Sequence, residues 1–252
     1  MFWLAAAIVL WIVVALLAGP LLRNPRDDVE GGLVYHTLRL YVWLLHRPAV
    51  AGREHVPRTN APGSMIVVAN HASGVDPLLV QYVLPFEPRW MMAAHMRHPL
   101  GEGLWRWARI IFVSQRERDA AGVRDALRHL ADGGVLGLFP EGGIERRKRT
   151  LRPFQPGIGM LIRRSNAPVL PIVIEDAPMA STAWASLAKP SRPRIRILPP
   201  VQYDRTTPPA EIAADLQARF EKWTGWAVEG KPDDAPEDDA RAENGASAGV
   251  AV

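Results

Sequence analysis

The stretch VVANHASGVDPLLV, residues 67–80, contains the pattern that decides the fold. It begins in an apolar, mostly β-branched run, passes through a short polar segment, and becomes apolar again after Pro77. The first run predicts a buried strand over residues 65–69, and the proline favours a helix over residues 77–83. Gly74, between the two, permits a tight turn. The stretch therefore predicts a strand-to-helix unit of the kind from which α/β domains are built.

The same alternation of short apolar runs and helical spacing continues downstream. The predicted strands are residues 65–69, 90–94, 110–114, 135–139, 169–174 and 194–198, and the predicted helices are residues 77–83, 99–108, 120–131, 156–164 and 208–226. This order predicts a single α/β domain over residues 51–228, with a central mixed sheet flanked by helices.

The composition limits the chemistry and indicates an anionic partner. The 252 residues include no cysteine, which excludes disulfides, thiol nucleophiles and cysteine-ligated zinc, and fits a reducing compartment. Residues 229–252 contain no aromatic residue and seven acidic against two basic side chains, so we expect a disordered acidic tail there. The rest of the chain is more basic than the formal net charge of +4 indicates. This favours anionic lipid, a phosphate-bearing substrate or nucleic acid as the partner.

The N-terminal segment favours a membrane among these partners. Residues 1–22, MFWLAAAIVLWIVVALLAGPLL, carry no charged side chain, and a bilayer-spanning helix needs roughly 17–25 apolar residues. The segment lacks the basic n-region of a secretory signal peptide, so we expect an uncleaved membrane anchor helix. Arg23 and Arg26 follow at once, which predicts a protein of the cell inner membrane with its folded domain in the cytoplasm.

Residues 23–50 predict a second hydrophobic element. The stretch GGLVYHTLRLYVWLLHRP, residues 31–48, begins at glycines and ends at a proline, as helices do. Its aromatic and aliphatic body with basic residues along it is typical of an amphipathic helix that lies at the membrane interface. A helix that packs on the folded domain explains the same pattern, and the sequence favours neither interpretation.

His71 and Asp76 follow the first predicted strand, at the edge where α/β sheets bind their ligands. An imidazole there can remove a proton from a hydroxyl, and a carboxylate on its other ring nitrogen would fix the tautomer. The chain has neither a G-x-S-x-G elbow nor a cysteine, so His71 would act on a substrate directly. The H-x4-D pattern alone is weak, because an ordinary polar turn in which Asp76 caps the helix is the simpler interpretation.

The stretch LGLFPEGG, residues 136–143, places a carboxylate at the end of another predicted strand. The glycines after Glu141 allow the backbone to approach a ligand closely. The basic run that follows, IERRKRTLR, could bind phosphate by charge-assisted hydrogen bonds, or it could be a solvated loop.

Four blocks in this order carry a resemblance to a known family. They are NHASGVD (residues 70–76), IIFVSQRER (110–118), LFPEGG (138–143) with LRPFQPGIG (151–159), and APVLPIVI (167–174). Together they resemble the motifs of the glycerolipid acyltransferases, whose best-known members are lysophosphatidic acid acyltransferases. The resemblance covers roughly residues 52–203, and the apolar N-terminus fits a membrane-bound member.

The resemblance implies a reaction and roles for the residues. A fatty acyl group would pass from acyl-CoA or acyl carrier protein to a hydroxyl of a lysophospholipid, without a metal or other cofactor. His71 would be the general base and Asp76 the carboxylate that orients it. The acceptor site would include the residues of the third block, which are Phe139, Pro140, Glu141 and Gly142.

Two departures from the family pattern concern the acceptor. Gln115 and Ile144 stand where the family has arginines that are associated with the acceptor's phosphate. Either Arg116 and Arg146 or Arg147 take over this role, or the acceptor is a different lipid without a phosphate, such as an amino-lipid. Glutamine and isoleucine cannot replace the bidentate fork of an arginine.

A non-catalytic protein that binds membrane surfaces is the alternative from another class. Nucleic acid is not expected as a partner, because the chain has an apolar anchor and no recognisable nucleic-acid-binding module. Trp105 and Trp107 could line an acyl-chain tunnel, lie at the membrane interface or simply pack in the protein. His95 and His98 are spaced as metal ligands could be, but an exposed loop pair is the simpler interpretation.

Overall fold

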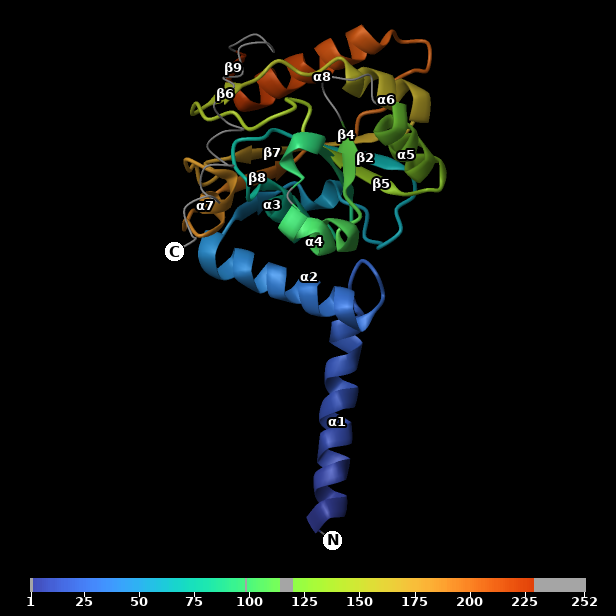
Figure 1. Ribbon diagram of the computed structural model, residues 1–252, viewed down its shortest axis with the longest axis vertical. Helices are drawn as coiled ribbons and strands as arrows, with labels where there is room; N and C mark the ends of the chain where they lie inside the picture. Colours follow the sequence, from blue (N-terminus) through green and yellow to red (C-terminus); the bar gives the residue numbers. More distant parts are fainter. Residues whose placement is uncertain (1, 98, 114–119, 229–252) are drawn as a thin grey trace.

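The computed structural model describes residues 2–97, 99–113 and 120–228 of the chain. Helix α1 (Phe2–Leu22) extends away from the body of the molecule, and α2 (Val29–Tyr41) lies across the base of that body (Figure 1). A short π-helical turn, Val42–His46, continues α2 and leads into the sheet. The predicted acidic tail, residues 229–252, lies outside the described residues.

A seven-stranded sheet forms the centre of the body, with the order β1-β8-β7-β2-β5-β3-β4. Every neighbouring pair is parallel except β7 and β8, which are antiparallel, so the predicted mixed sheet is confirmed. The strands are β1 (Ala49–Ala51), β2 (Met65–Ala69), β3 (Arg89–Ala93), β4 (Ile111–Val113), β5 (Val135–Leu138), β7 (Val169–Glu175) and β8 (Arg194–Ile197). Two further short strands, β6 (Thr150–Leu151) and β9 (Ala227–Val228), pair with each other outside this sheet.

Helices cover both faces of the sheet, as the prediction of an α/β domain requires (Figure 1). Helices α5, α6 and α8 contribute to the apolar core on one face, and α3 and the end of α2 contribute to the core on the other. The helices after α2 are α3 (Asp76–Val83), α4 (Glu102–Trp107), α5 (Ala120–Ala131), α6 (Gly157–Ser165), α7 (Ala183–Leu187) and α8 (Pro209–Thr224). Short 3-10 turns span Arg53–His55, Ala94–Met96 and Pro99–Gly101.

Strand β2 shows why its sequence is apolar throughout. Ile66 and Val68 point into the core beneath α5, α6 and α8, whereas Met65, Val67 and Ala69 point into the core beneath α3. All five side chains are buried because both faces of the sheet are covered. The run therefore lacks the polar alternation of a half-exposed strand.

The structure departs from the predicted elements at a few places. A 3-10 turn followed by the short helix α4 replaces the single helix predicted over residues 99–108. Strand β1 pairs in parallel with β8, so the sheet begins at Ala49, two residues before the predicted domain boundary. Three residues are too few to produce a recognisable period.

Helix α2 packs on the domain, as one of the two interpretations of its sequence has it, and the interfacial interpretation stays a prediction. Leu38 and Tyr41 pack on the core, whereas Leu33 and Leu40 are exposed. Residues 2–22 form a helix, but among the residues that the structure describes no helix is both long and apolar enough to cross a membrane. The spanning anchor is therefore not confirmed by the structure.

Candidate active site

The candidate active site lies where the parallel strands β2 and β5 end side by side, next to β7. Strand β2 lies between β5 and β7, with Val68 opposite Leu138 and Ala69 opposite Ile172. The segments that leave β2 and β5 therefore emerge next to each other and bring His71 close to Glu141. Because β3 and β7 lie on opposite sides of this pair, the site is at a topological switch point, where α/β sheets usually bind ligands.

His71 and Asp76 form the predicted pair. The Nδ1 atom of His71 lies 2.9 Å from Oδ2 of Asp76, whose side chain is fully buried at the start of α3. The same oxygen accepts hydrogen bonds from the backbone N–H groups of Ala72 (2.8 Å) and Ser73 (2.7 Å). The carboxylate therefore closes the turn and holds the imidazole at once. It does not cap α3 as the simpler interpretation predicted, because Asp76 is the first residue of that helix and Val75 occupies the cap position without a side-chain hydrogen bond.

These contacts determine which ring nitrogen can act as a base. An ionised carboxylate only accepts hydrogen bonds, so Nδ1 of His71 carries the ring proton and donates it to Asp76. The Nε2 atom then keeps its lone pair. His71 lines a cavity, and 14% of its side chain is exposed. The ring can therefore accept a proton from a group bound there.

Phe139 fixes the plane of the imidazole. Its ring stacks on His71 with centroids 3.9 Å apart and 13° between the planes. The Phe139 ring also stacks on Trp90, with centroids 4.9 Å apart and 11° between the planes. The series of three rings runs from the end of β2 across the end of β5 to β3. The sequence predicted Phe139 as part of the site but did not indicate Trp90.

Three residues of the His71 turn also support the site, although the sequence indicated only the tight turn and not their contacts. The side chain of Asn70 accepts from the N–H of Ile174 (2.8 Å) and donates to its carbonyl (2.9 Å). Ser73 Oγ donates to the carbonyl of Pro178 at 2.7 Å. Gly74 lies against the carbonyl of Ala183, so closely that a side chain there would overlap it. The turn is thereby bound to the end of β7 and to the segment after it, and only tertiary contacts reveal this.

Glu141 is buried, and only 2% of the residue is exposed. Its Oε1 accepts from the N–H of His71 at 2.7 Å, and its Oε2 accepts from the N–H of Arg152 at 2.8 Å. Burial raises the pKa of Glu141 to about 8. The two N–H donors lower this pKa, and the nearby negative charges of Asp76 and Glu145 raise it. Its predicted role in the acceptor site stays a prediction.

Pro140 and Gly142 form the turn around Glu141. The carbonyl of Pro140 accepts from the N–H of Gln155 at 2.7 Å, and Gly142 adopts a left-handed backbone with φ of 69°. Gly142 is exposed, so its backbone can be reached by a ligand. Their predicted part in binding an acceptor is untested.

The predicted phosphate-binding arginines have protein partners. Arg146 donates to the carbonyls of Ala180 (3.0 Å) and Ser181 (2.5 Å). Arg147 forms an ion pair with Glu145 at 3.1 Å. Arg116 lies outside the described residues, as does His98. The predicted role of Arg146 and Arg147 in binding a phosphate stays a prediction.

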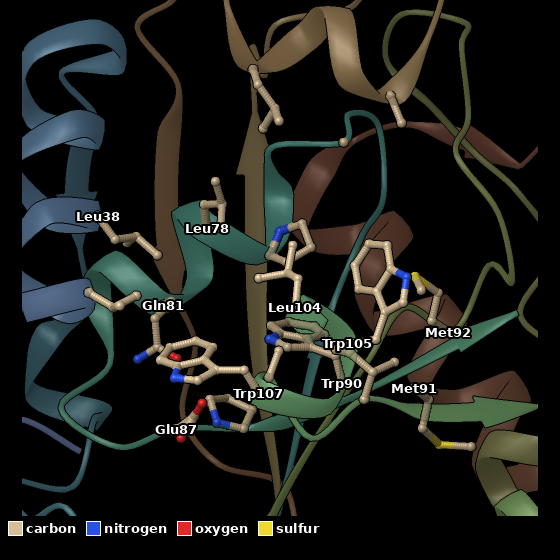
Figure 2. A pocket seen from close by; sticks show the side chains of 18 of the residues that line it. Leu38, Leu78, Gln81, Glu87, Trp90, Met91, Met92, Leu104, Trp105 and Trp107 are labelled. Carbon is tan, nitrogen blue, oxygen red and sulfur yellow. The ribbon is translucent and has the colours of Figure 1, made fainter. Parts of the chain in front are cut away.

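A cavity of about 430 Å³ opens beside His71. Figure 2 shows the tryptophans of β3 and α4, Trp90, Trp105 and Trp107, gathered around it with Met91 and Met92. Further apolar lining comes from α2, α3, α4, α7 and the segment after β5, and includes Val34, Leu38, Leu78, Leu104, Ile144, Trp184 and Leu187. Both tryptophans that the sequence singled out on α4 thus line the cavity.

An ion pair of Arg26, which lies in the segment between α1 and α2, contributes to the cavity wall. Arg26 binds Glu87 through two hydrogen bonds of 2.6 and 2.5 Å, and its guanidinium lies 3.9 Å from the ring centroid of Trp107. Among the described residues that line the cavity, Arg26 is the single arginine or lysine, and Glu87 neutralises it. Among all the residues that the structure describes, no group of three or more histidine or acidic side chains could hold a metal ion.

These features combine an α/β fold with a candidate active site beside an apolar cavity. A histidine with one available ring nitrogen lies at the wall of an apolar cavity, and the segments after two parallel strands hold it. Such a site can remove a proton from a hydroxyl while an apolar chain occupies the cavity.

The comparison with protein families matches residues 47–175 to the acyltransferase family. The chain belongs to this family, among members like the lysophosphatidic acid acyltransferases, and is therefore an acyltransferase. This result argues against the alternative of a non-catalytic protein that binds membrane surfaces.

Individual relatives agree with the assignment. The 1-acyl-sn-glycerol-3-phosphate acyltransferase alpha of Mus musculus is 30% identical over 206 residues, which cover 79% of this chain and 71% of that protein. The N-acylphosphatidylethanolamine synthase of Arabidopsis thaliana is 30% identical over 133 residues, or 46% of this chain and 45% of that protein. The crystal structure of the lysophosphatidic acid acyltransferase PlsC from Thermotoga maritima has the same fold, with a TM-score of 0.59 and 20% identity over 78% of this chain and 83% of that chain.

Proposed function

We propose that this acyltransferase transfers a fatty acyl group from acyl-CoA or acyl carrier protein to the hydroxyl of a lysophospholipid of the lysophosphatidic acid type. The observation that carries this proposal is the His71–Asp76 pair at the wall of an apolar cavity. The relatives that bear the name 1-acyl-sn-glycerol-3-phosphate acyltransferase support the choice of acceptor.

His71 is the general base in this mechanism. Its Nε2 atom removes the proton from the acceptor hydroxyl while the oxygen attacks the carbonyl carbon of the acyl thioester. The tetrahedral intermediate then collapses, the C–S bond breaks, and the sulfur leaves with the proton that Nε2 received. The products are an ester and a free thiol. The negative charge of Asp76 stabilises the imidazolium that exists between the two proton transfers.

The acyl chain occupies the cavity. Tryptophan, methionine and leucine side chains line it, and burying a methylene group in such surroundings is worth about 0.8 kcal/mol. Because His71 is part of the same wall, the thioester carbonyl of a bound chain would lie within reach of the base. No metal or other cofactor takes part in this scheme.

The enzyme works at a membrane in this proposal, as a protein of the inner membrane with its domain in the cytoplasm. Helix α1 carries large exposed apolar side chains, among them Trp3, Leu4 and Trp11, at 83%, 69% and 71% exposure. Leu104 and Trp184 at the cavity are more than half exposed as well. A lysophospholipid could then reach the site from the lipid.

A lipid acceptor without a phosphate, such as an amino-lipid, is the second candidate. Ile144 lines the cavity beside His71, at the position where an arginine would be expected to bind a phosphate. The similarity to a protein named N-acylphosphatidylethanolamine synthase also favours a comparison of amine with hydroxyl acceptors.

Thiol release from acyl-CoA tests the proposal when it is measured against a panel of lysolipids with and without a phosphate. We expect wild-type activity with a lysophosphatidic acid and a loss of at least about 10²-fold in His71→Ala, the usual scale of a general base. Circular dichroism serves as the control for folding. A folded His71→Ala variant with undiminished activity would contradict the mechanism. Activity restricted to acceptors without a phosphate would select the second candidate.

A further inference from the structure

The main chain of His71 is held on both sides by the segment that follows β5. The N–H of His71 donates to Oε1 of Glu141 at 2.7 Å. The carbonyl of His71 accepts from the N–H of Glu145 at 2.8 Å. The residue that carries the base is thus bound by its backbone to another part of the chain, 70 residues downstream.

The second carboxylate oxygen of Glu141 is also used within the protein. It accepts from the N–H of Arg152 at 2.8 Å, and the residue is 2% exposed. Both oxygens therefore face backbone donors, in a place that a substrate does not reach. The carboxylate joins the His71 turn, the turn after β5 and the start of the segment at Arg152.

We propose that Glu141 is a positioning residue, which holds the main chain of His71 so that Nε2 points into the cavity. In this role Glu141 does not touch the acceptor. It contributes to the acceptor site only through the segment between residues 141 and 152, whose two ends its hydrogen bond with Arg152 holds together. The inference rests on the proposed function, since it assigns a task to Glu141 in the reaction of His71.

The contacts of the His71 ring leave this task open. Asp76 fixes the Nδ1 edge of the ring, and Phe139 fixes its face. Neither contact fixes the direction in which the main chain presents the side chain, because His71 lies beyond the last residue of β2. A misplacement of about 1 Å at a reacting group can cost on the order of 10²-fold in rate, so this direction matters for proton transfer.

The substitution Glu141→Gln tests the proposal with little change of shape. An amide has one oxygen and one NH₂ group, so one of the two N–H donors would face another donor. The contact with either His71 or Arg152 must therefore break. Glu175→Gln is the matched control, because Glu175 ends the neighbouring strand β7, is largely buried, and pairs with arginines away from the site.

We expect kcat of Glu141→Gln to fall roughly 10- to 100-fold, while KM for both substrates stays within about twofold. The assay is run at pH 9, above the pKa of about 8, so that the wild-type carboxylate is ionised. Glu175→Gln should keep kcat within about twofold. A raised KM for the lysolipid with unchanged kcat would overturn the proposal, because it would mean that Glu141 contacts the acceptor.

Proton NMR separates positioning from a purely structural role. The low-field resonance of the Nδ1–H that bonds to Asp76, assigned by its loss in His71→Ala, should shift or broaden in Glu141→Gln and persist in Glu175→Gln. An unchanged resonance, with a rate loss that follows a lower melting temperature, would overturn the proposal. If the wild type releases no thiol with any acceptor, the proposed function fails, but the resonance still reports whether Glu141 positions the ring.

Discussion

At the scale of single residues, Asn70 ends strand β2 in an unusual way. Its side-chain amide donates to and accepts from the backbone of Ile174. These two hydrogen bonds use the donor and the acceptor that Ile174 would otherwise offer to a continuing strand β2. The edge of β7 is therefore satisfied although the main chain of β2 has already turned away. The backbone of His71 is free to bond to the segment after β5 instead.

Glu141 makes the stability of the protein depend on pH. Burial raises its pKa from 4.5 to about 8, so between these values the folded protein holds a proton that the unfolded chain has lost. The free energy of unfolding therefore falls as the pH rises from about 5 to about 8, by a few kcal/mol, and levels off above that. Chemical denaturation across this range should show the decrease in the wild type.

The variant Glu141→Gln isolates this contribution. Without the carboxyl group, the unfolding free energy should decrease less with pH than in the wild type, and Glu175→Gln should follow the wild type. Parallel curves for Glu141→Gln and the wild type would mean that the carboxyl titrates near its ordinary pKa in the folded protein.

At the scale of elements, α7 packs directly on the His71 turn. The helix begins at the side-chain cap of Thr182, and the carbonyl of Ala183 fills the space beside Gly74. Trp184 and Leu187 of the same helix line the cavity. The close approach at Gly74 therefore sets how near the cavity wall lies to the base.

Gly74→Ala should weaken this contact. The added methyl group overlaps the carbonyl of Ala183, and overpacking of this kind typically costs about 1–3 kcal/mol. We expect a lower melting temperature, measured by differential scanning calorimetry, and reduced activity. Gly103→Ala in α4 is the control, because nothing lies within 4 Å of a methyl group there and alanine favours a helix. Equal melting temperatures of Gly74→Ala and the wild type would show that α7 can move aside at no cost.

The longer elements and the short strand β4 could be predicted from the sequence, and the other short strands and α7 could not. The runs that became β2, β5 and β7 are apolar throughout because helices cover both faces of the sheet, and burial of this kind is visible in composition alone. Strands β1, β6 and β9 have two or three residues, and α7 has five, so they offer no period to recognise. The three strands form only because they pair with segments that are distant in the sequence.

The same distinction applies to the site. His71, Asp76 and Phe139 could be predicted because each lies in a motif at the end of a strand. The contacts of Trp90 with Phe139 and of Arg26 with Glu87 join segments that are 49 and 61 residues apart. No local pattern marks such pairs. The carboxylate of Glu141 was expected at the site, but its direction, toward backbone donors, depends on tertiary structure.

At the scale of the whole molecule, α1 stands apart from the domain (Figure 1). Its exposed side chains Ile8 and Ile12, at 52% and 45% exposure, lie one helical turn apart. Exposed apolar side chains of this kind can mark an interaction surface, and the proposed function assigns this surface to lipid. The exposed Leu33, Leu40, Trp43 and Leu44 after it extend the apolar surface along α2 and the π-helical turn.

The double substitution Ile8→Lys and Ile12→Lys tests attachment through α1. A lysine near the centre of an inserted helix costs roughly 2.5–3.5 kcal/mol, so the variant should move from the membrane fraction to the soluble fraction. Sedimentation of cell membranes measures the distribution. The control is the double variant Asp125→Lys and Asp132→Lys, on exposed positions around α5. It also adds two lysines and should leave the distribution between the fractions unchanged. A double lysine variant of α1 that stays with the membranes would show that another surface holds the protein there.

The commitment of one imidazole nitrogen to Asp76 has a consequence for the order of events in catalysis. In the proposed reaction a single atom, Nε2, must first take the proton and later give it back. The acceptor oxygen and the thioester sulfur therefore share the same small space, and both substrates must be present before either product departs. Such an enzyme follows sequential rather than ping-pong kinetics, and the protein itself never carries the acyl group.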